Sequence, residues 1–307
     1  MLEVDAIIVG GGPAGLSAAI YLARFNRSVV VIDHGEGRST SSEVNENYLG
    51  FPEGIASTEL RQLGRRQAER FGTGFIDAFV DSIQREGDGF VVNGVAPAAR
   101  GRTLILATGV TDILPQFENE DARDYWGTSL YWCITCDGYK ARGASVMVVG
   151  NDDSAATTCL QFLEFTDKLT FVSNQPEGRC AVSDEQRDAL RAAGVDFYEG
   201  RLKRVDGTGG RMRAVELEDG RRIELEFLFN QQGAVPNSDL ARALGVPIDE
   251  SGYVTVDAEQ RTSVRRVYAA GDLTKAYAHQ VATAAHEGAT AAISANYDLY
   301  SPEQREH

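Results

Sequence analysis

The sequence predicts an α/β fold built from two β-α-β domains, with the second domain inserted into the first. A glycine-rich turn at residues 10–15 joins a short apolar strand to a helix. A similar strand, turn and helix begin again at residue 145, and residues 233–237 resemble a return of the chain to the first domain. These observations are typical of Rossmann-like, three-layer ββα dinucleotide-binding domains. We expect the first domain at 1–113 and 237–307 and the second at 114–236.

The composition limits the classes of partner. The chain has 307 residues, of which 43% are hydrophobic and 24% charged, as in a globular protein with a packed core. Its net charge of −15 disfavours nucleic acid and anionic membrane surfaces. We find no apolar run long enough to span a membrane and no signal peptide. Four cysteines are too few for a secreted disulfide scaffold, so a cytoplasmic location is expected.

Residues 5–33 carry the strongest cofactor motif, because a strand, a G-x-G-x-x-G turn, a helix and a second strand follow one another in register. Gly10 allows the tight turn, Gly12 lets the backbone approach a pyrophosphate, and Gly15 lets helix and strand pack closely. Asp33 ends the second strand, where it can accept hydrogen bonds from ribose hydroxyls. A glycine turn in an unrelated α/β domain is the alternative. The turn supplies the candidate phosphate-binding residues Gly10, Gly12, Pro13, Ala14 and Gly15.

The remainder of the first domain follows in order. A helix is expected over 58–71, and short strands with turns predict a small antiparallel meander from residue 74 to residue 92. The next buried strand ends in the small-residue turn Ala107-Thr108-Gly109. Turns of this kind lie at the carboxyl edge of doubly wound sheets, where ligands bind.

Cys133 and Cys136 form a C-x-x-C motif, which is typical of a labile disulfide with one activated thiol. Asp137 follows directly, so its carboxyl could donate or accept a proton when the disulfide opens or closes. A zinc site is an alternative, but it requires a second ligand pair. Cys159 and Cys180 are 21 positions apart, and the four histidines form no H-x3–5-H pair. Two buried cysteines without chemistry are the other alternative.

The second glycine turn departs from the first where phosphate would approach. It keeps Gly150 and Ala155, but Asp152 stands at the middle glycine position and Asp153 adds a second negative charge. The next strand offers no arginine pair for a 2′-phosphate, and Arg179 is the nearest base. Capping of the following helix is the structural alternative for both aspartates. Both interpretations predict poor NADPH binding.

The C-terminal region returns to the first domain. An apolar strand ends in Gly271-Asp272, and an alanine-rich helix is expected over 280–295. A simple turn is the alternative interpretation of Gly271-Asp272. His279 and His286 fit helix-surface or capping positions better than catalytic ones.

Together, these motifs resemble the low-molecular-weight thioredoxin reductase family over nearly the whole chain. The resemblance rests on 10–15, Asp33, the loop 47–52, 107–109, C-I-T-C-D-G at 133–138, Gly271-Asp272 and His279-Gln280-Val281. It implies FAD in the first domain, completed by the C-terminal segment. The family's second domain binds NADPH through G-x-G-x-x-A and a basic run, which this chain lacks. The family usually has arginine where His279 stands.

The resemblance also assigns roles. Cys136 would face the flavin, Cys133 would exchange with the partner disulfide, and Asp137 would be the acid/base. Asp272 would hold the ribityl chain, while Gln280 and Val281 would lie near the isoalloxazine. The expected FAD-binding residues also include Asn47, Ala107, Thr108, Gly109 and His279.

We therefore expect an FAD-dependent disulfide oxidoreductase that resembles the ferredoxin-linked, NADPH-independent members of the family. Electrons would pass between flavin and the Cys133–Cys136 pair and on to a thioredoxin-like protein or a small disulfide. The acidic balance argues against ferredoxin unless arginines gather at one face. One FAD per chain is expected, with a second nucleotide in the inserted domain as an open alternative. The resemblance also implies a homodimer.

Three other functions remain open. The first is an NADPH-dependent thioredoxin-disulfide reductase with an atypical nucleotide site. The second is a dithiol oxidase that passes electrons to O2, although such enzymes usually carry histidine where Asp137 stands. The third is a redox sensor or scaffold that binds FAD without turnover.

Overall fold

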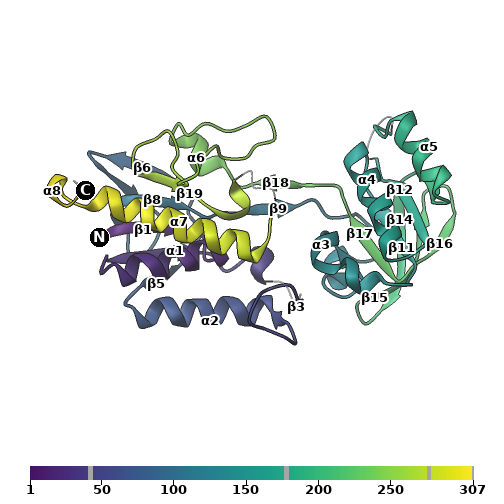
Figure 1. Cartoon of the computed structure of the whole chain (residues 1–307), viewed down its shortest axis with the longest axis horizontal. Coiled ribbons are helices and arrows are strands. Elements are labelled where there is room, and N and C mark those ends of the chain that lie inside the picture. The colour runs from purple at the N-terminus through teal and green to yellow at the C-terminus, as the bar shows by residue number, and fades with distance from the viewer. Residues whose placement is uncertain (41–43, 176–179, 275–277, 306–307) are drawn as a thin grey trace. The chain divides into compact units, whose positions relative to one another are not determined.

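The computed structural model describes residues 1–40, 44–175, 180–274 and 278–305, and the chain divides into two compact units (Figure 1). The first unit comprises Met1–Ser41, Ile55–Thr111 and Val235–His307, and the second comprises Ser42–Gly54 and Asp112–Ala234. The chain therefore passes from one unit to the other four times. Each unit has its own central sheet and its own hydrophobic core.

The sheet of the first unit has the strand order β5-β2-β1-β8-β7-β6, and β19 also pairs with β8. Its strands are β1 (Leu2–Val9), β2 (Val29–Asp33), β5 (Gly74–Asp77), β6 (Ile83–Glu86), β7 (Gly89–Val92), β8 (Ala99–Leu106) and β19 (Val267–Ala269). The strands β5, β2, β1, β8 and β19 run parallel. They read as continuous apolar runs because both faces of the sheet are covered.

Alternate residues of these strands enter two different cores, as the two-residue period of a strand requires. Ile8 and Val31 pack with α1 (Pro13–Arg24) and α7 (Val281–Leu299) on one face. Ile7 and Val30 pack on the other face, together with residues of α6 (Asp239–Ala243). The helices α1 and α7 are rich in alanine, so they approach each other closely.

One expectation for this unit is wrong. The meander predicted from residue 74 to residue 92 is antiparallel only from β6 onward, because β5 pairs parallel with β2. The helix α2 (Ser57–Arg70) lies between β2 and β5 in sequence. β5 therefore closes a helical crossover, and a strand reached through such a crossover joins its sheet in the parallel direction.

The second unit has a parallel sheet of order β10-β17-β11-β12-β13 and an antiparallel sheet of order β14-β15-β16. The core residues Val148 and Phe171 pack with α4 and α5, whereas Met147 and Val172 pack with β14 and β15. The unit is therefore three-layered, and the predicted α/β fold class is confirmed. Its elements are β10 (Leu130–Tyr131), β11 (Val146–Val149), α4 (Asp153–Gln161), β12 (Leu169–Ser173), α5 (Asp184–Ala192), β13 (Asp196–Glu199), β14 (Leu202–Thr208), β15 (Arg211–Leu217), β16 (Arg222–Glu224) and β17 (Phe227–Asn230).

The shorter elements connect these layers. They are η1 (Arg38–Thr40), β3 (Val44–Asn45), β4 (Ile55–Ala56), β9 (Val110–Asp112), η2 (Ala122–Tyr125), α3 (Ile134–Asp137), η3 (Gly138–Ala141), η4 (Phe162–Glu164), β18 (Ala234–Pro236), η5 (Gly271–Leu273) and α8 (Pro302–Arg305). Among the helices of the described ranges, none is long and apolar enough to cross a membrane.

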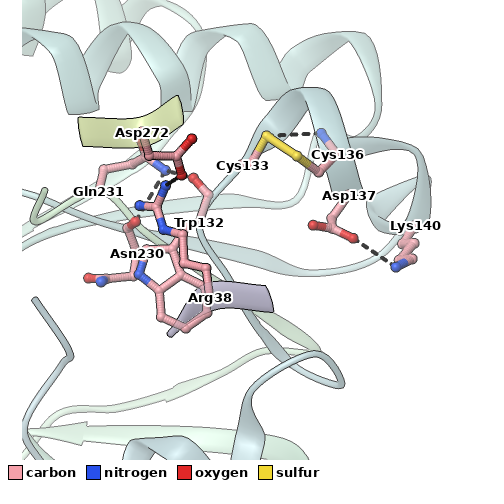
Figure 2. The surroundings of a disulfide bond; sticks show 9 residues. All are labelled: Arg38, Trp132, Cys133, Cys136, Asp137, Lys140, Asn230, Gln231 and Asp272. Atoms are coloured by element: carbon pink, nitrogen blue, oxygen red, sulfur yellow. Dashed lines mark hydrogen bonds and ion pairs between the residues drawn. A yellow bond between two sulfur atoms is a disulfide. The ribbon is translucent and has the colours of Figure 1, made fainter. Parts of the chain in front are cut away.

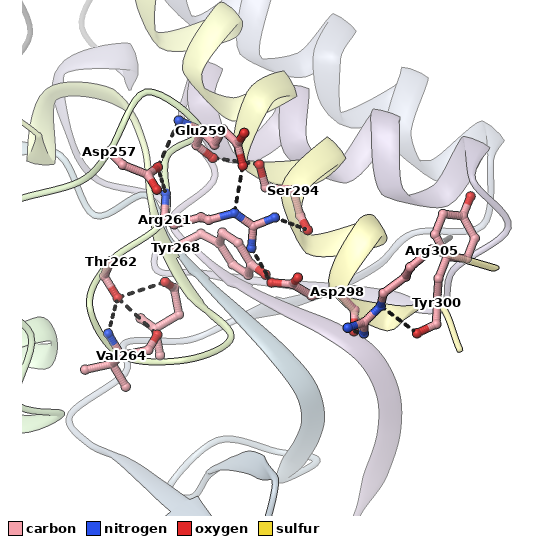
Figure 3. Close-up of polar contacts among 11 residues, drawn as sticks. Asp257, Glu259, Arg261, Thr262, Val264, Tyr268, Ser294, Asp298, Tyr300 and Arg305 are labelled. Carbon is pink, nitrogen blue, oxygen red and sulfur yellow. Dashed lines mark hydrogen bonds and ion pairs between the residues drawn. The ribbon is translucent and has the colours of Figure 1, made fainter. Parts of the chain in front are cut away.

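A polar cluster fixes α7 to the sheet of the first unit (Figure 3). The carboxylate of Asp298 on α7 accepts hydrogen bonds from the Arg261 guanidinium and the Tyr268 hydroxyl. The same guanidinium contacts Glu259 at 2.9 Å and the carbonyl of Ser294 at 3.4 Å. Burial raises the pKa of Tyr268, and the hydrogen bond to Asp298 raises it further, so this tyrosine remains protonated.

Candidate redox and nucleotide sites

The second unit holds a disulfide between Cys133 and Cys136 at the start of α3 (Figure 2). Their Cα atoms are 5.2 Å apart. The backbone N–H of Cys136 donates to the Sγ of Cys133 at 3.1 Å. Both residues are partly exposed. A sulfur that accepts a backbone N–H is stabilised as a thiolate, so the local geometry favours Cys133 as the nucleophile of the reduced pair.

Asp137 is the last residue of α3, and only 1% of its surface is exposed. The Nζ of Lys140 lies 2.7 Å from one carboxylate oxygen, Oδ1 (Figure 2). The other oxygen, Oδ2, is buried without a hydrogen-bond partner among the described residues. Burial is the largest influence on the pKa of Lys140 and lowers it, but the hydrogen bond to Asp137 and the charges of the neighbouring groups together outweigh burial and raise this pKa above its usual value.

The residue before the disulfide is held from the neighbouring strand. The carbonyl of Trp132 accepts a hydrogen bond of 2.5 Å from the Nε2 of Gln231, which directly follows β17 (Figure 2). The Trp132 ring packs against Trp126, with ring centroids 4.5 Å apart. These contacts anchor the segment that carries Cys133 to the parallel sheet.

The first glycine turn has the shape that a dinucleotide requires. Gly10 has a φ of +107°, and a Cβ at this position would lie 2.2 Å from the carbonyl oxygen of Ala107. A Cβ on Gly15 would lie 1.9 Å from the carbonyl oxygen of Gly10. At Gly12, by contrast, the nearest atom to a Cβ is the Ser39 hydroxyl at 3.8 Å. The backbone therefore leaves room for a pyrophosphate at the N-terminus of α1, and these residues fit FAD.

Three of the predicted FAD segments lie at one edge of the first unit's sheet. The ends of β1, β8 and β19 are in register, with Val9 opposite Leu106 and Leu106 opposite Ala269. The turns that follow these strands are consequently neighbours, as ligand-binding turns of a doubly wound sheet are. They contain Gly10, Gly12, Pro13, Ala14, Gly15, Ala107, Thr108, Gly109 and Asp272.

Several of these residues have contacts that the sequence did not predict. Asp33 accepts a hydrogen bond from the N–H of Gly11 at 3.0 Å and pairs with the Arg61 guanidinium on α2. The carboxylate of Asp272 lies 2.9 Å from the Nη1 of Arg38 (Figure 2). No spacing in the sequence marks these two arginines as partners of the predicted residues, and Arg61 is one of four arginines on α2.

The remaining predicted residues are distributed between the two units. The Nε2 of His279 lies 3.2 Å from the carbonyl oxygen of Thr274, and its ring packs against Tyr253. Gln280 is the N-cap of α7, and Val281 is its first residue. Asn47, in contrast, belongs to the second unit, together with the disulfide.

A buried acid beside the Gly271 turn was also not predicted. Glu287 on α7 accepts hydrogen bonds from the N–H of Gly271 at 2.7 Å and from the hydroxyl of Thr274 at 3.1 Å. Burial raises the pKa of Glu287, and the hydrogen bond from Gly271 opposes this rise only in part. The residue is an acid on the small-residue face of a helix, and that pattern could have identified it.

The second glycine turn is occupied by its own chain. Asp152 caps α4 by accepting a hydrogen bond of 2.8 Å from the N–H of Ala155. The Oδ1 of Asp153 accepts from the N–H of Ser183 at 2.7 Å, and the Oδ1 of Asn151 accepts from the N–H of Ala181 at 3.2 Å. Three side chains of the turn thus satisfy backbone N–H groups of the same unit. Arg179 lies outside the described residues.

The other two cysteines are buried. Burial raises the pKa of the Cys159 thiol to about 12, which makes it unreactive at neutral pH, and Cys180 is also in the core. Within the described parts of the chain, no group of three or more histidine, cysteine, aspartate or glutamate side chains could hold a metal ion.

Comparisons with known proteins agree on one relationship. A family model described as pyridine nucleotide-disulphide oxidoreductase matches residues 4–288. A thioredoxin reductase of Mycolicibacterium smegmatis is 33% identical over 299 residues, which cover 95% of each chain. NADPH-dependent thioredoxin reductase 3 of Arabidopsis thaliana is 32% identical over 97% of this chain and 58% of its own length. The crystal structure of thioredoxin reductase from Streptococcus pyogenes superposes with a TM-score of 0.86 at 27% identity, covering 97% of this chain and 98% of its own.

Proposed function

This chain belongs to the pyridine nucleotide-disulphide oxidoreductase family as a thioredoxin reductase-like flavoprotein, and from this premise we propose that it exchanges electrons between FAD and Cys133–Cys136 without using NADPH. The partner that receives or supplies the thiol electrons is a thioredoxin-like protein. The other electron partner is a one-electron donor of the ferredoxin type. FAD, when bound, supplies the conversion between one-electron and two-electron chemistry.

The first unit is the proposed FAD site. Gly10, Gly12 and Gly15 present the N-terminus of α1 to the pyrophosphate, and Asp33 accepts from the ribose. Asp272, which is paired with Arg38, would hold the ribityl chain. The other proposed FAD contacts of this unit are Pro13, Ala14, Ala107, Thr108, Gly109, His279, Gln280 and Val281. Asn47, which belongs to the second unit, stays a prediction from the sequence.

The second unit carries the thiol chemistry. In the dithiol form, the Cys133 thiolate attacks the partner disulfide, forms a mixed disulfide and releases the first partner thiolate. Cys136 then loses its proton and attacks the sulfur of Cys133, which restores the intramolecular disulfide and releases the second partner thiolate. The two thiolates take up two protons, so the partner gains two electrons and two protons. Asp137 is the proposed acid/base of this exchange.

The observation that carries the NADPH-independent part is the self-contained turn at 150–155. A phosphate at this turn would have to approach two carboxyl side chains and displace hydrogen bonds that Asn151, Asp152 and Asp153 make to their own unit. The approach of a negatively charged phosphate to acidic side chains costs free energy. The loss of the hydrogen bonds that these side chains make to backbone N–H groups adds to this cost. The geometry therefore supports a donor that reduces the flavin directly.

An NADPH-dependent reductase with an atypical nucleotide site is the second candidate. The observation that favours it is the name of the Arabidopsis relative, which is NADPH-dependent. The two candidates differ in what reduces the flavin and agree on the thiol chemistry.

The deciding experiment is anaerobic reduction of the purified flavoprotein. Reduction is measured as the loss of the yellow absorbance of the flavin. NADPH, NADH and a photoreduced ferredoxin are mixed with the protein in parallel. We expect fast bleaching with ferredoxin and none with either pyridine nucleotide. Rapid and complete bleaching by NADPH would instead establish the second candidate.

A further inference from the structure

Among the described residues, Lys140 is the only charged side chain in contact with the buried carboxylate of Asp137. It lies on η3, three residues after Asp137, and its Nζ is 2.7 Å from Oδ1. Its side chain is 21% exposed, whereas that of Asp137 is 1% exposed. The ammonium therefore stands between the buried carboxylate and solvent.

Other groups that face Lys140 come from two further segments of the second unit. The ring of Tyr131 on β10 lies beneath the ammonium, with its centroid 5.1 Å from Nζ. The carboxylate of Glu46 lies 3.8 Å from Nζ, on the loop that follows β3. The ammonium is thus held by an aromatic face and two carboxylates. All these neighbours favour its charged form, and the pKa of Lys140 is accordingly raised despite burial.

Burial disfavours the charged form of a carboxylate, whereas a cation in contact with it favours that form. The Lys140 ammonium counteracts the effect of burial by direct contact with Oδ1. The ammonium contacts Oδ1 only. The other oxygen of Asp137, Oδ2, is buried and has no hydrogen-bond partner among the described residues. An ionised carboxylate that has one oxygen without a hydrogen-bond partner can accept a proton at that oxygen.

We propose that Lys140 is a positioning residue that keeps Asp137 ionised, with Oδ2 available as the base for the Cys136 thiol. This proposal rests on the function proposed above for the Cys133–Cys136 pair. It assigns the direction of proton transfer, which the acid/base role of Asp137 alone leaves open.

The step concerned is closure of the ring after Cys133 has formed a mixed disulfide. Asp137 accepts the proton of Cys136, the Cys136 thiolate attacks the Sγ of Cys133, and the bond between Cys133 and the partner sulfur breaks. The partner leaves as a thiolate with the electron pair of that bond. The proton then passes from Asp137 to the partner thiolate or to solvent.

Ring closure can be measured without an electron donor or a protein partner. The flavoprotein is reduced with dithiothreitol, desalted anaerobically and mixed with one equivalent of 4,4′-dithiodipyridine. The first thiopyridone reports the attack by Cys133, and the second reports ring closure by Cys136. The leaving thiopyridone needs no protonation, so the pH dependence of the second phase reports deprotonation of Cys136.

We expect Lys140→Met to move the acid limb of this second phase to higher pH by about one unit or more, which is a slowing of about tenfold on the acid side. Lys140→Arg retains a cation and should restore most of the rate. Asp137→Asn should abolish the acid limb that depends on the carboxylate. Lys168→Met is the matched control, because Lys168 is an exposed lysine of the same unit that donates to the carbonyl of Gly143.

Failure of this proposal is distinguishable from failure of the proposed function. If the wild-type protein releases no second thiopyridone, the disulfide cycle itself is wrong. If ring closure occurs but Lys140→Met leaves its acid limb in place or moves it to lower pH, Lys140 does not keep Asp137 ionised. A Lys140→Arg variant that behaves like Lys140→Met would also overturn the proposal. Retained flavin absorbance in each variant shows that it is folded.

Discussion

The carboxylate of Asp152 accepts a 2.8 Å hydrogen bond from the N–H of Ala155, so a side chain of the turn itself binds an amide at the N-terminus of α4. Loss of such an N-cap typically costs about 1 kcal/mol. We expect Asp152→Ala to lower the free energy of unfolding of the second unit by about this amount, and Asp152→Asn to lower it much less. Urea unfolding followed by tryptophan fluorescence measures this, because Trp126 and Trp132 both belong to that unit. Equal losses in the two variants would contradict the capping role.

Gly15 provides a prediction for FAD. Its Cβ would lie 1.9 Å from the carbonyl oxygen of Gly10, which is backbone and cannot yield without distorting the turn. We expect Gly15→Ala to be purified with little or no FAD, as measured from the ratio of flavin to protein absorbance. Gly200→Ala is the control, because the nearest atom to its Cβ is 3.6 Å away in the Leu217 side chain. A Gly15→Ala protein with a full complement of flavin would exclude this turn as the FAD site.

Glu287 provides a prediction for pH. Burial raises its pKa above the usual value of 4.5, so the folded protein binds this proton more tightly than the unfolded chain. The stabilising contribution is complete below pH 4.5 and is lost as the pH rises through the folded-state pKa. We therefore expect Glu287→Gln to gain stability relative to the wild type as the pH rises from 4.5 toward neutral. Chemical unfolding at a series of pH values tests the sign, with the exposed Glu185→Gln as a control.

The cluster around Asp298 provides a prediction for stability. Asp298→Ala removes the acceptor of both the Arg261 guanidinium and the Tyr268 hydroxyl, and the buried hydroxyl then has no carboxylate partner (Figure 3). The expected loss is about 1–3 kcal/mol, which is the usual effect of leaving a buried polar group unsatisfied. The control Asp188→Ala breaks an exposed ion pair with Arg191 and should change stability by less than about 0.5 kcal/mol. Similar melting temperatures for both variants would refute the assignment.

The predictable parts of this protein depend on local patterns. The turn at 10–15 follows from the spacing of its glycines. The capping interpretation of Asp152 also depends on neighbouring residues, and the hydrogen bond to Ala155 confirms that it caps α4. The roles assigned to Cys133, Cys136 and the FAD-binding residues stay predictions.

The unpredicted parts depend on residues that are distant in sequence. Arg38 and Asp272 are 234 positions apart, and Arg61 is 28 positions from Asp33, so no periodicity connects either pair. The direction of β5 depends on which strand it joins, and strand spacing alone does not report this. The contact between Lys140 and Asp137 was also not predicted, but these two residues are close in sequence. They lie three residues apart in a helical segment, where side chains at this spacing are neighbours.

The packing of α7 against α1 also constrains the order in which the protein can mature during synthesis. A Cβ on Gly288 would lie 2.0 Å from the carbonyl oxygen of Ala14, and the hydroxyl of Ser17 donates to the carbonyl of Ala285 at 2.6 Å. The first glycine turn emerges from the ribosome well before α7, because Ser17 and Ala285 are 268 positions apart in the chain. The nascent chain must therefore keep an apolar face of α1 uncovered until α7 has been synthesised, and flavin capture is expected only after α7 has left the ribosome.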